Sequence, residues 1–147
     1  MAETDARMGH SRKVYLTDSV VSSVTSGVEE QDWLTGETTN TVNLNGNLIE
    51  VSDKSSGAWQ KFISGVKGAT IDVTVNVFDT DEKQKQLLTS FFAGQKVFVF
   101  VGDLNSKTGY ACEALISSIS ETNDNGAVST RSISLTANGE VKNIVAA

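Results

Sequence analysis

The sequence predicts a mainly β protein, an antiparallel sandwich or barrel with one α-helix packed at its side. Three observations lead to this prediction. Residues 69–77 alternate apolar and polar side chains without interruption, which is the period of a strand with one buried face. Only residues 80–93 carry the spacing and end signals of a helix. The other apolar segments are short, and Gly, Asn, Asp and Ser separate them because the chain contains no proline.

Length and composition predict one globular domain, residues 1–147. With 39% hydrophobic residues, a chain of 147 residues can bury an adequate core. No apolar run approaches the roughly 20 residues of a membrane span, and residues 1–13 lack the apolar block of a secretory signal. We therefore expect a soluble protein with no membrane partner. A single cysteine, Cys112, excludes an internal disulfide and a cysteine-based metal cluster, and we expect it inside a strand.

The net charge of -6 is concentrated in one segment. Residues 14–52 contain acids but no Lys or Arg, whereas residues 1–13 sum to +1 and the acids and bases after residue 52 nearly balance. A protein that binds nucleic-acid phosphates tightly needs a basic face. The charge distribution argues against that class of function.

The first third of the chain predicts an arm, a strand and a long loop. Residues 1–13 have no apolar period and are expected to form an extended N-terminal arm. Residues 14–21 have the β-branched and aromatic character of a strand. Residues 22–47 are polar and acidic, and a loop of this length is usually functional or disordered. Trp33 within it should either tuck back onto its own domain or be covered by a partner. Asn45-Gly46 predicts a tight hairpin turn near the end of this segment.

Residues 54–68 predict a turn with an apolar plug. Three glycines surround Trp59, Phe62 and Ile63, and we expect these side chains to fold under a chain reversal as a core plug. The strand at 69–78 follows directly. Its polar face, which should meet water or a neighbour, is formed by Thr70, Asp72, Thr74 and Asn76.

The helix at 80–93 has signals at both ends. Asp79 can cap it together with Glu82, and Gly94 supplies the stop. Its charged residues around Lys83 and Lys85 predict a solvated face. The apolar stripe that should lie on a sheet is formed by Leu87, Leu88, Phe91 and Phe92.

The last third predicts three strands and a tail. Residues 97–101 are continuously apolar, as in a strand covered on both faces, and one short helix can leave such a face to a neighbouring chain. Residues 110–119 and 127–137 form two more strands joined by a turn. Asn138-Gly139 then ends the sheet and leaves residues 140–147 as a C-terminal tail.

The sequence contains no recognisable catalytic or metal-binding motif. The one histidine, His10, lies in the arm and far from Cys112. There is no nucleophile elbow, two-histidine metal spacing, P-loop or dinucleotide fingerprint, and residues 79–81 lack the spaced ligands of a calcium loop. We expect no cofactor, no metal and no enzymatic activity.

The chain from residue 54 onward resembles the major tail tube proteins of long, non-contractile-tailed bacteriophages. The resemblance rests on Ser-Ser-Gly-Ala-Trp-x-x-Phe-Ile-x-Gly-Val-Lys at 55–67, followed by the strand at 69–78, the helix at 80–93 and the apolar strand at 97–101. It ends at Ile133-Ser134-Leu135-Thr136-Ala137-Asn138-Gly139-Glu140-Val141 and covers roughly two thirds of the chain. Ala58 and Ser64 depart from the family, in which many relatives have glycine and proline there.

This resemblance implies a structural virion protein. The family fold is a small β-sandwich or barrel similar to the tube protein of type VI secretion. Six subunits would form a ring whose inner strands join into one barrel, and the stacked rings would form a tube through which DNA passes without specific binding. Implied partners are further copies of the chain and the tape measure, tail-tip and tail-terminator proteins. Assembly would occur in the cytoplasm of the bacterial host and end in the virion tail.

Two sets of contact residues follow as hypotheses. The polar face at Thr70, Asp72, Thr74 and Asn76 would line the lumen. The +1 arm and the acidic segment 22–47 would bridge rings, with charge complementarity setting the register. The bridging residues would be Arg7, Arg12, Lys13, Glu29, Glu30, Asp32, Trp33, Leu34, Val42 and Leu44.

Three other interpretations stay open. The chain could be a non-enzymatic binding module that uses residues 22–47 to hold a protein partner. It could be the tube protein of a phage-like secretion system. An enzyme with an unrecognised site is the third.

Overall fold

The computed structural model describes residues 12–17, 28, 32–104 and 106–145. The strands in these ranges are β1 (Lys13–Thr17), β2 (Glu37–Glu50), β3 (Phe62–Asn76), β4 (Val97–Asp103), β5 (Thr108–Thr122), β6 (Thr130–Ala137) and β7 (Lys142–Ile144). One α-helix, α1 (Glu82–Ala93), lies between β3 and β4, and a short 3-10 turn occupies Lys54–Ser56. The predicted fold class, mainly β and antiparallel with one flanking helix, is confirmed.

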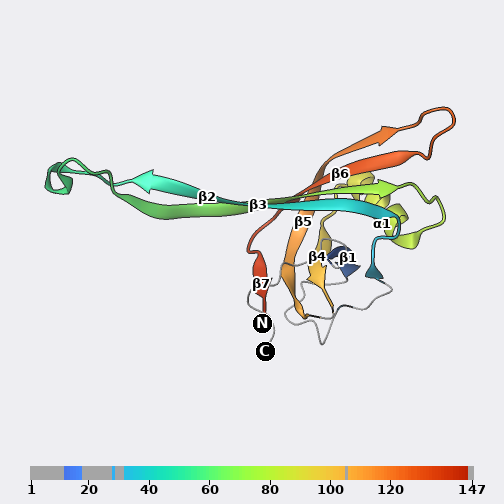
Figure 1. Cartoon of the computed structure of the whole chain (residues 1–147), viewed down its shortest axis with the longest axis horizontal. Helices are drawn as coiled ribbons and strands as arrows, with labels where there is room; N and C mark the ends of the chain where they lie inside the picture. Colours follow the sequence, from blue (N-terminus) through green and yellow to red (C-terminus); the bar gives the residue numbers. More distant parts are fainter. Residues whose placement is uncertain (1–11, 18–27, 29–31, 105, 146–147) are drawn as a thin grey trace, which may run out of the picture.

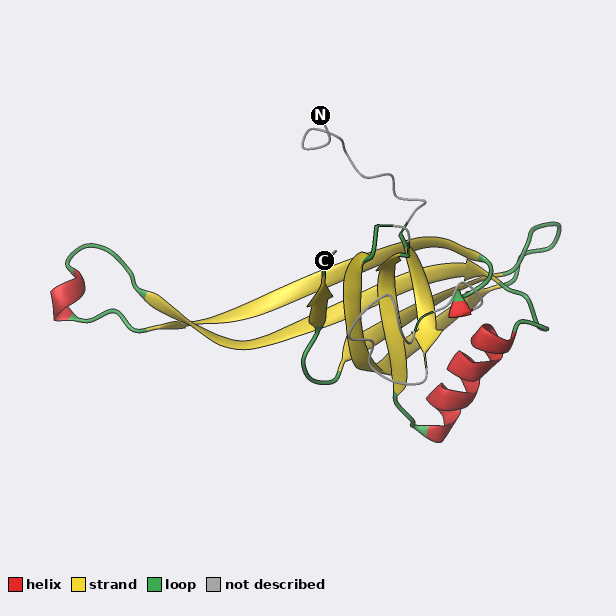
Figure 2. Ribbon diagram, turned by 90° about the horizontal axis from the view of Figure 1, so that it is seen from below, coloured by secondary structure: helices red, strands yellow, loops and turns green. Residues whose placement is uncertain are grey.

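The strands form one curled antiparallel sheet in the order β1-β4-β5-β6-β3-β2, and β7 pairs with the start of β5. Figures 1 and 2 show the barrel-like body that results, with α1 against its side and a long β2–β3 hairpin projecting away from it. The two outer strands approach each other across a seam. There the Leu34 amide donates to the Val14 carbonyl at 3.0 Å, and Tyr15 forms an isolated bridge with Trp33.

The core has two parts because β4 is covered on both faces. The main cluster lies inside the curled sheet and receives alternate residues of β3, β4 and β6 together with Leu87 of α1. A smaller cluster on the other face gathers around Phe100, whose ring lies 5.9 Å from that of Tyr15. Both faces of the predicted apolar strand are therefore buried by this chain, and no neighbour is needed to cover it. Cys112 is buried in β5, as predicted.

The predicted turn at Asn45-Gly46 and the predicted loop up to Asn47 are wrong. β2 runs through both, from Glu37 to Glu50, and the chain reverses only at residues 51–61. β3 offers a partner along this whole length, so the Asn-Gly pair is absorbed as a register shift between Gly46 and Leu48. Residues 22–27 and 29–31 of the predicted loop lie outside the described residues.

The helix is confirmed, but its cap and its buried face differ from the prediction. The carboxylate of Asp81, not that of Asp79, accepts from the Gln84 amide at 3.1 Å. Gly94 ends the helix with φ 69°, as expected. The buried face is Gln84, Leu87 and Ser90. Of the predicted stripe, Leu88 is half-buried, Phe91 and Phe92 are exposed, and only Leu87 lies in the core, because α1 meets the sheet along a narrow line.

The C-terminal tail is also corrected in part. Lys142–Ile144 forms β7, antiparallel to Gly109–Ala111 of β5. The side chain of Ile144 is buried in the smaller cluster beside Phe100. The break at Asn138-Gly139 therefore redirects the chain from β6 to a second position along β5 and does not end the sheet.

Candidate assembly surfaces

The β2–β3 hairpin extends well beyond the body (Figures 1 and 2). β2 and β3 pair from Glu37 opposite Val75 out to Glu50 opposite Phe62. β6 flanks β3 only from Thr70 to Asn76. Between Thr70 and the tip at residues 51–61 the hairpin therefore has no further strand of the described chain beside it, and most of its residues are exposed.

The outer part of this hairpin is rich in exposed apolar side chains. Trp59 is 82% exposed, Phe62 48% and Ile63 52%. The predicted core plug is therefore wrong: these residues precede the point at which β6 joins β3, so no part of the body lies over them. Apolar surface of this extent on one subunit marks an interaction site. Its other members are Leu44, Leu48, Ile49, Val51 and Val66.

The predicted polar face of β3 lies opposite the core. Ala69, Ile71, Val73 and Val75 are buried, whereas the alternate residues Thr70, Asp72, Thr74 and Asn76 are exposed or half-buried. The Ser134 hydroxyl donates to Asp72 at 2.6 Å, and the hydroxyls of Thr74 and Ser132 are 3.4 Å apart.

This polar face continues onto the strands beside β3. The register places Ser118 and Ser120 of β5 beside Ser134 and Ser132 of β6. On the other side of β3, it places Thr41 beside Asp72. The result is a surface of hydroxyls on four strands, with Asp72 as the charged member of these rows.

The residues predicted to bridge rings have different positions. Arg7, Glu29 and Glu30 lie outside the described residues. Leu34 is fully buried in the main core and is unable to meet another chain, so that part of the prediction is wrong. Val42 is half-buried against the same core, whereas Leu44 is exposed at the base of the hairpin.

The remaining bridging candidates gather near the seam. Trp33 is half-buried: its Nε1–H donates to Glu37 at 3.0 Å, and Lys13 Nζ lies 4.7 Å from the ring centroid. Of the two interpretations of Trp33, the structure shows the one in which it tucks back onto its own domain. Arg12 donates to the Thr108 carbonyl at 3.0 Å, and Asp32 pairs with Lys83 at 3.4 Å.

Glu37 joins the segments of the seam. Its carboxylate accepts from the Val14 amide at 2.9 Å, from Trp33 at 3.0 Å and from Asn40. Asn40 also donates to the Arg12 carbonyl at 3.1 Å. No sequence pattern marks Glu37, because a lone glutamate in a polar run gives no signal until the run is known to be an edge strand.

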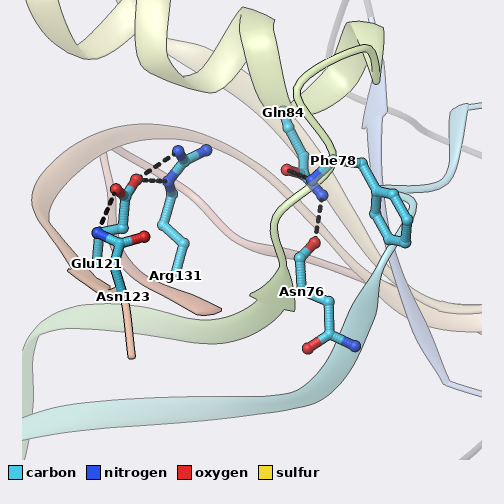
Figure 3. Close-up of polar contacts among 6 residues, drawn as sticks. All are labelled: Asn76, Phe78, Gln84, Glu121, Asn123 and Arg131. Carbon is cyan, nitrogen blue, oxygen red and sulfur yellow. Dashed lines mark hydrogen bonds and ion pairs between the residues drawn. The ribbon is translucent and has the colours of Figure 1, made fainter. Parts of the chain in front are cut away.

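Gln84 fastens the helix to the sheet (Figure 3). Its Oε1 accepts from the Phe78 amide at 3.0 Å, while Nε2 donates to the carbonyls of Asn76 at 3.0 Å and Thr35 at 2.6 Å. The side chain is buried. It therefore fixes the end of β3, from which the polar face begins.

A polar cluster holds the base of the β5–β6 turn (Figure 3). Arg131 is buried and donates twice to Glu121, at 2.6 and 3.1 Å, while Asn123 donates to the other carboxylate oxygen at 3.0 Å. The hydrogen bond from Asn123 and the nearby Arg131 guanidinium lower the pKa of the Glu121 carboxyl.

Two strand edges have no partner among the described residues. β4 leaves β5 at Ala114, so from Leu115 to Thr122 β5 has β6 on one side and no described strand on the other. β2 ends the sheet, and its second edge is open from Thr41 to Glu50. A groove of about 680 Å³ lies beside the start of that edge, lined by residues that include Lys13, Trp33 and Asn40. Open edges of this length are sites for pairing with another chain.

Among the described residues we find no metal-binding cluster and no activated cysteine. No group of three or more His, Cys, Asp or Glu side chains within them could hold a metal ion. Burial raises the pKa of the Cys112 thiol to about 11, so it is a poor nucleophile. No helix among these residues is long and apolar enough to span a membrane.

Comparison with known proteins gives a family and a set of similar structures. The model of a family described as phage tail tube protein matches residues 20–143. No match was found among the curated protein sequences. A chain in the virion of the native gene transfer agent (GTA) particle aligns with a TM-score of 0.75 and 16% identity, covering 94% of this chain and 98% of that chain.

Two other solved structures are similar. A chain in the tail of the empty GTA particle, described with helical refinement and C6 symmetry, has a TM-score of 0.72 and 18% identity over 97% of this chain and 100% of that one. The SPP1 tail tube, a hybrid structure from solid-state NMR and cryo EM, has a TM-score of 0.74 and 16% identity. The alignment covers 96% of this chain and 80% of that chain. At these identities the structural likeness shows the fold.

Proposed function

Because the chain belongs to the phage tail tube protein family, we propose that six copies form a ring, that rings stack into the tube of a virion tail, and that DNA passes through the lumen. Family membership indicates a structural and not an enzymatic protein. The observation that carries the proposal is the pair of open strand edges on β2 and β5. The C6 symmetry of the GTA tail, whose chain has this fold, supports a ring of six.

The strand directions allow these edges to close a ring. β2 is antiparallel to β3, β3 to β6 and β6 to β5, so β5 runs opposite to β2. When β2 of one copy lies beside β5 of the next, the antiparallel alternation continues around the ring. Each open N–H and C=O then gains a partner, and the edges disappear.

The hydroxyl-rich face suits the inner surface of such a barrel. The core covers the other face of the sheet, so this face would meet the DNA. The rows that contain Thr70, Asp72, Thr74 and Asn76 present hydroxyls, amides and one carboxylate, together with the apolar side chain of Leu115. Without Lys or Arg in these rows, phosphates find no strong contact, and DNA can slide.

Contacts between rings come mainly from the β2–β3 hairpin in this proposal. Its exposed apolar side chains need cover, and a second copy in the next ring supplies it. We still propose that the arm at 1–13 and the acidic residues Glu29 and Glu30 bridge neighbouring rings. Arg12, Lys13 and Asp32 contribute less, since each already binds a group in its own chain.

The remaining partners follow from the shape of a tube. Its two ends leave hairpins and ring faces uncovered, where tail-tip and tail-terminator proteins would bind, and a tape measure protein would occupy the lumen before DNA does. Assembly would take place in the cytoplasm of the bacterial host. The tube of a phage-like secretion system would use the same contacts.

Size-exclusion chromatography followed by negative-stain electron microscopy tests the proposal. The purified protein should give rings or long tubes of uniform width as its concentration rises. A protein that stays monomeric or dimeric at all concentrations, while binding a partner through residues 22–47, would instead be a binding module.

A further inference from the structure

The groove at the seam between β1 and β2 has a basic character. It has a volume of about 680 Å³, lies beside the start of the open edge of β2, and is lined by both Arg12 and Lys13. Glu37 is the one acid among its lining residues. The carboxylate of Glu37 already accepts hydrogen bonds from the Val14 amide, Trp33 and Asn40. The groove therefore favours an anionic group.

Lys13 is the cation of the groove that has donors left for another chain. Its Nζ lies 4.7 Å from the centroid of the Trp33 ring, and a cation–π attraction holds it there. Within the described part of the chain, the ammonium of Lys13 forms no ion pair with a carboxylate. Arg12 differs, because its Nη1–H donates to the Thr108 carbonyl at 3.0 Å and to the Thr108 hydroxyl at 3.1 Å.

The turn between β5 and β6 has the opposite charge. Residues 115–130 contain Glu121 and Asp124 and no Lys or Arg. Glu121 already pairs with Arg131 at 2.6 Å. Asp124 is exposed, and its carboxylate forms no ion pair with any residue that the structure describes. Asp124 is therefore the acid of this turn that has acceptors left for another chain.

The hydroxyl face limits the register that β2 and β5 can adopt in the proposed ring. Opposite residues of antiparallel strands share a face, so the hydroxyl rows stay continuous only when Thr41 lies opposite a residue of the same face of β5. Thr122, the last residue of β5, is on that face. Setting Thr41 opposite Thr122 uses the whole open edge of β5. It also sets Leu44, which is 55% exposed, opposite Ile119 on the other face.

In this register the β5–β6 turn reaches the groove of the neighbouring copy. The chain continues past Thr122 to Asp124, whose carbonyl accepts from the Ala127 amide at 3.2 Å as the chain reverses. Two residues advance about 7 Å at about 3.3 Å per residue, which brings Asp124 beside Thr39 of the neighbour. Thr39 lines the groove. The start of β2 and the β5–β6 turn lie at the same end of the molecule, as the contact requires (Figure 1).

From these features, and resting on the proposed ring, we infer that the β5–β6 turn of each copy docks in the groove of its neighbour, with the Asp124 carboxylate on the Lys13 ammonium. Turn and groove are different surfaces, so the contact is heterologous and closes after one circuit of the ring. Its role is to set the register of β2 on β5. A slip of two residues, the smallest that keeps the faces matched, moves the carboxylate by about 7 Å.

Charge reversal tests the ion pair. Lys13→Asp and Asp124→Lys should each raise the protein concentration at which tubes form by about fivefold, as expected for the loss of an exposed ion pair. The double variant should return that concentration toward the wild-type value, because the pair is restored with its signs exchanged. Light scattering and negative-stain electron microscopy measure it. The control is Asp124→Lys with Lys85→Asp, which restores the net charge at an exposed site on α1 and should give no recovery.

Disulfide trapping tests the position of the turn without relying on charge. Thr39→Cys and Asp124→Cys place two exposed thiols at the contact, while buried Cys112 stays unreactive. Under mild oxidation, tubes of this variant should give a ladder of linked chains that ends at one complete ring. Thr39→Cys with Thr89→Cys, whose second thiol is exposed on α1, should give no ladder.

The outcomes separate this contact from the tube function. Tubes that give neither the ladder nor the recovery in the double charge reversal would overturn the inference and leave the tube function standing. A ladder that runs past one ring would place the contact between rings and would also overturn it. Absence of rings and tubes from the wild-type protein would overturn the tube function, and this inference with it.

Discussion

Single polar side chains hold the body of the protein in shape. Gln84 bonds three backbone groups between α1 and the sheet, and Glu37 bonds the seam between β1 and β2. Both are satisfied, as every buried side-chain nitrogen and oxygen among the described residues is. A buried polar group that keeps all its partners fixes geometry, and losing one partner is costly.

Gln84→Ala should destabilise the subunit by about 2–4 kcal/mol, because it leaves the Phe78 amide without its acceptor and two carbonyls without a donor. The measurement is urea unfolding of the unassembled subunit. Gln86→Ala on the exposed side of the same helix is the matched control and should change the free energy of unfolding by less than about 0.5 kcal/mol. Equal effects of the two substitutions would contradict the role of Gln84.

Asp72→Lys should change the proposed lumen surface from one along which DNA slides into one that binds DNA. In a six-copy ring it replaces a circle of carboxylates by a circle of ammonium groups, which bind phosphates and release counterions. Co-sedimentation of tubes with short duplex DNA should rise about tenfold at low salt and return to the wild-type level at high salt. Asp124→Lys, at the β5–β6 turn, makes the same charge change away from the proposed lumen. If tubes of Asp124→Lys bound as much DNA as tubes of Asp72→Lys, the proposal that Asp72 faces the lumen would be wrong.

At the scale of elements, the outer part of the β2–β3 hairpin projects from a body that does not need it for its core. No residue between 47 and 66 belongs to either buried cluster. This part of the hairpin can therefore change without unfolding the body, which separates the energetics of folding from those of assembly.

Replacing residues 47–66 by Asn-Gly should leave a folded subunit that forms no long tubes. Gly46 and Lys67 are register partners, so a two-residue turn can join them. The free energy of unfolding should change by less than about 1 kcal/mol, since no core contact is lost. Urea unfolding and electron microscopy measure the two effects. Normal tubes from this variant would remove the hairpin from the stacking contact, whereas Val128→Ala on the other hairpin should leave tubes intact.

The base of the β5–β6 hairpin should make stability depend on pH. Glu121 has a lowered pKa in the folded chain, so its contribution is present above the ordinary carboxyl pKa and is lost as pH falls through the lowered value. Glu121→Gln should therefore be less stable than the wild type at neutral pH, and the difference should shrink on acidification. Urea titrations at a series of pH values measure it. A difference independent of pH would mean that the pair with Arg131 contributes nothing.

Local signals made some of these elements predictable. β3 shows period-two alternation, β4 is a continuous apolar run, and α1 has capping residues at its ends. All three signals depend on residues that are near neighbours in sequence. The hairpin was not predictable, because Asn45-Gly46 is a strong local turn signal that the long pairing with β3 overrides. Trp59 and Phe62 are misplaced for a different reason: exposed apolar residues, which we propose another copy covers, look in sequence like residues of the chain's own core. Glu37 and Gln84 gave no pattern, since their partners are distant backbone groups.

At the scale of the whole molecule, the proposed ring makes the subunit one part of a larger sheet. Its core is complete, yet the edges of β2 and β5 end without partners in the described chain, and a face of hydroxyls spans the strands between them. The hairpin extends that sheet beyond the body (Figure 1). A monomer gains nothing from these features, whereas a ring uses both edges and a stack of rings uses the hairpin.

A cryo-electron microscopy reconstruction of tubes grown from the purified protein would test the proposed ring. We expect β2 of each copy to lie antiparallel to β5 of its neighbour between Leu115 and Thr122, with Asp72 and the hydroxyl rows facing the lumen. A tube whose copies join through other elements, or whose lumen is lined by a different face of the sheet, would contradict it.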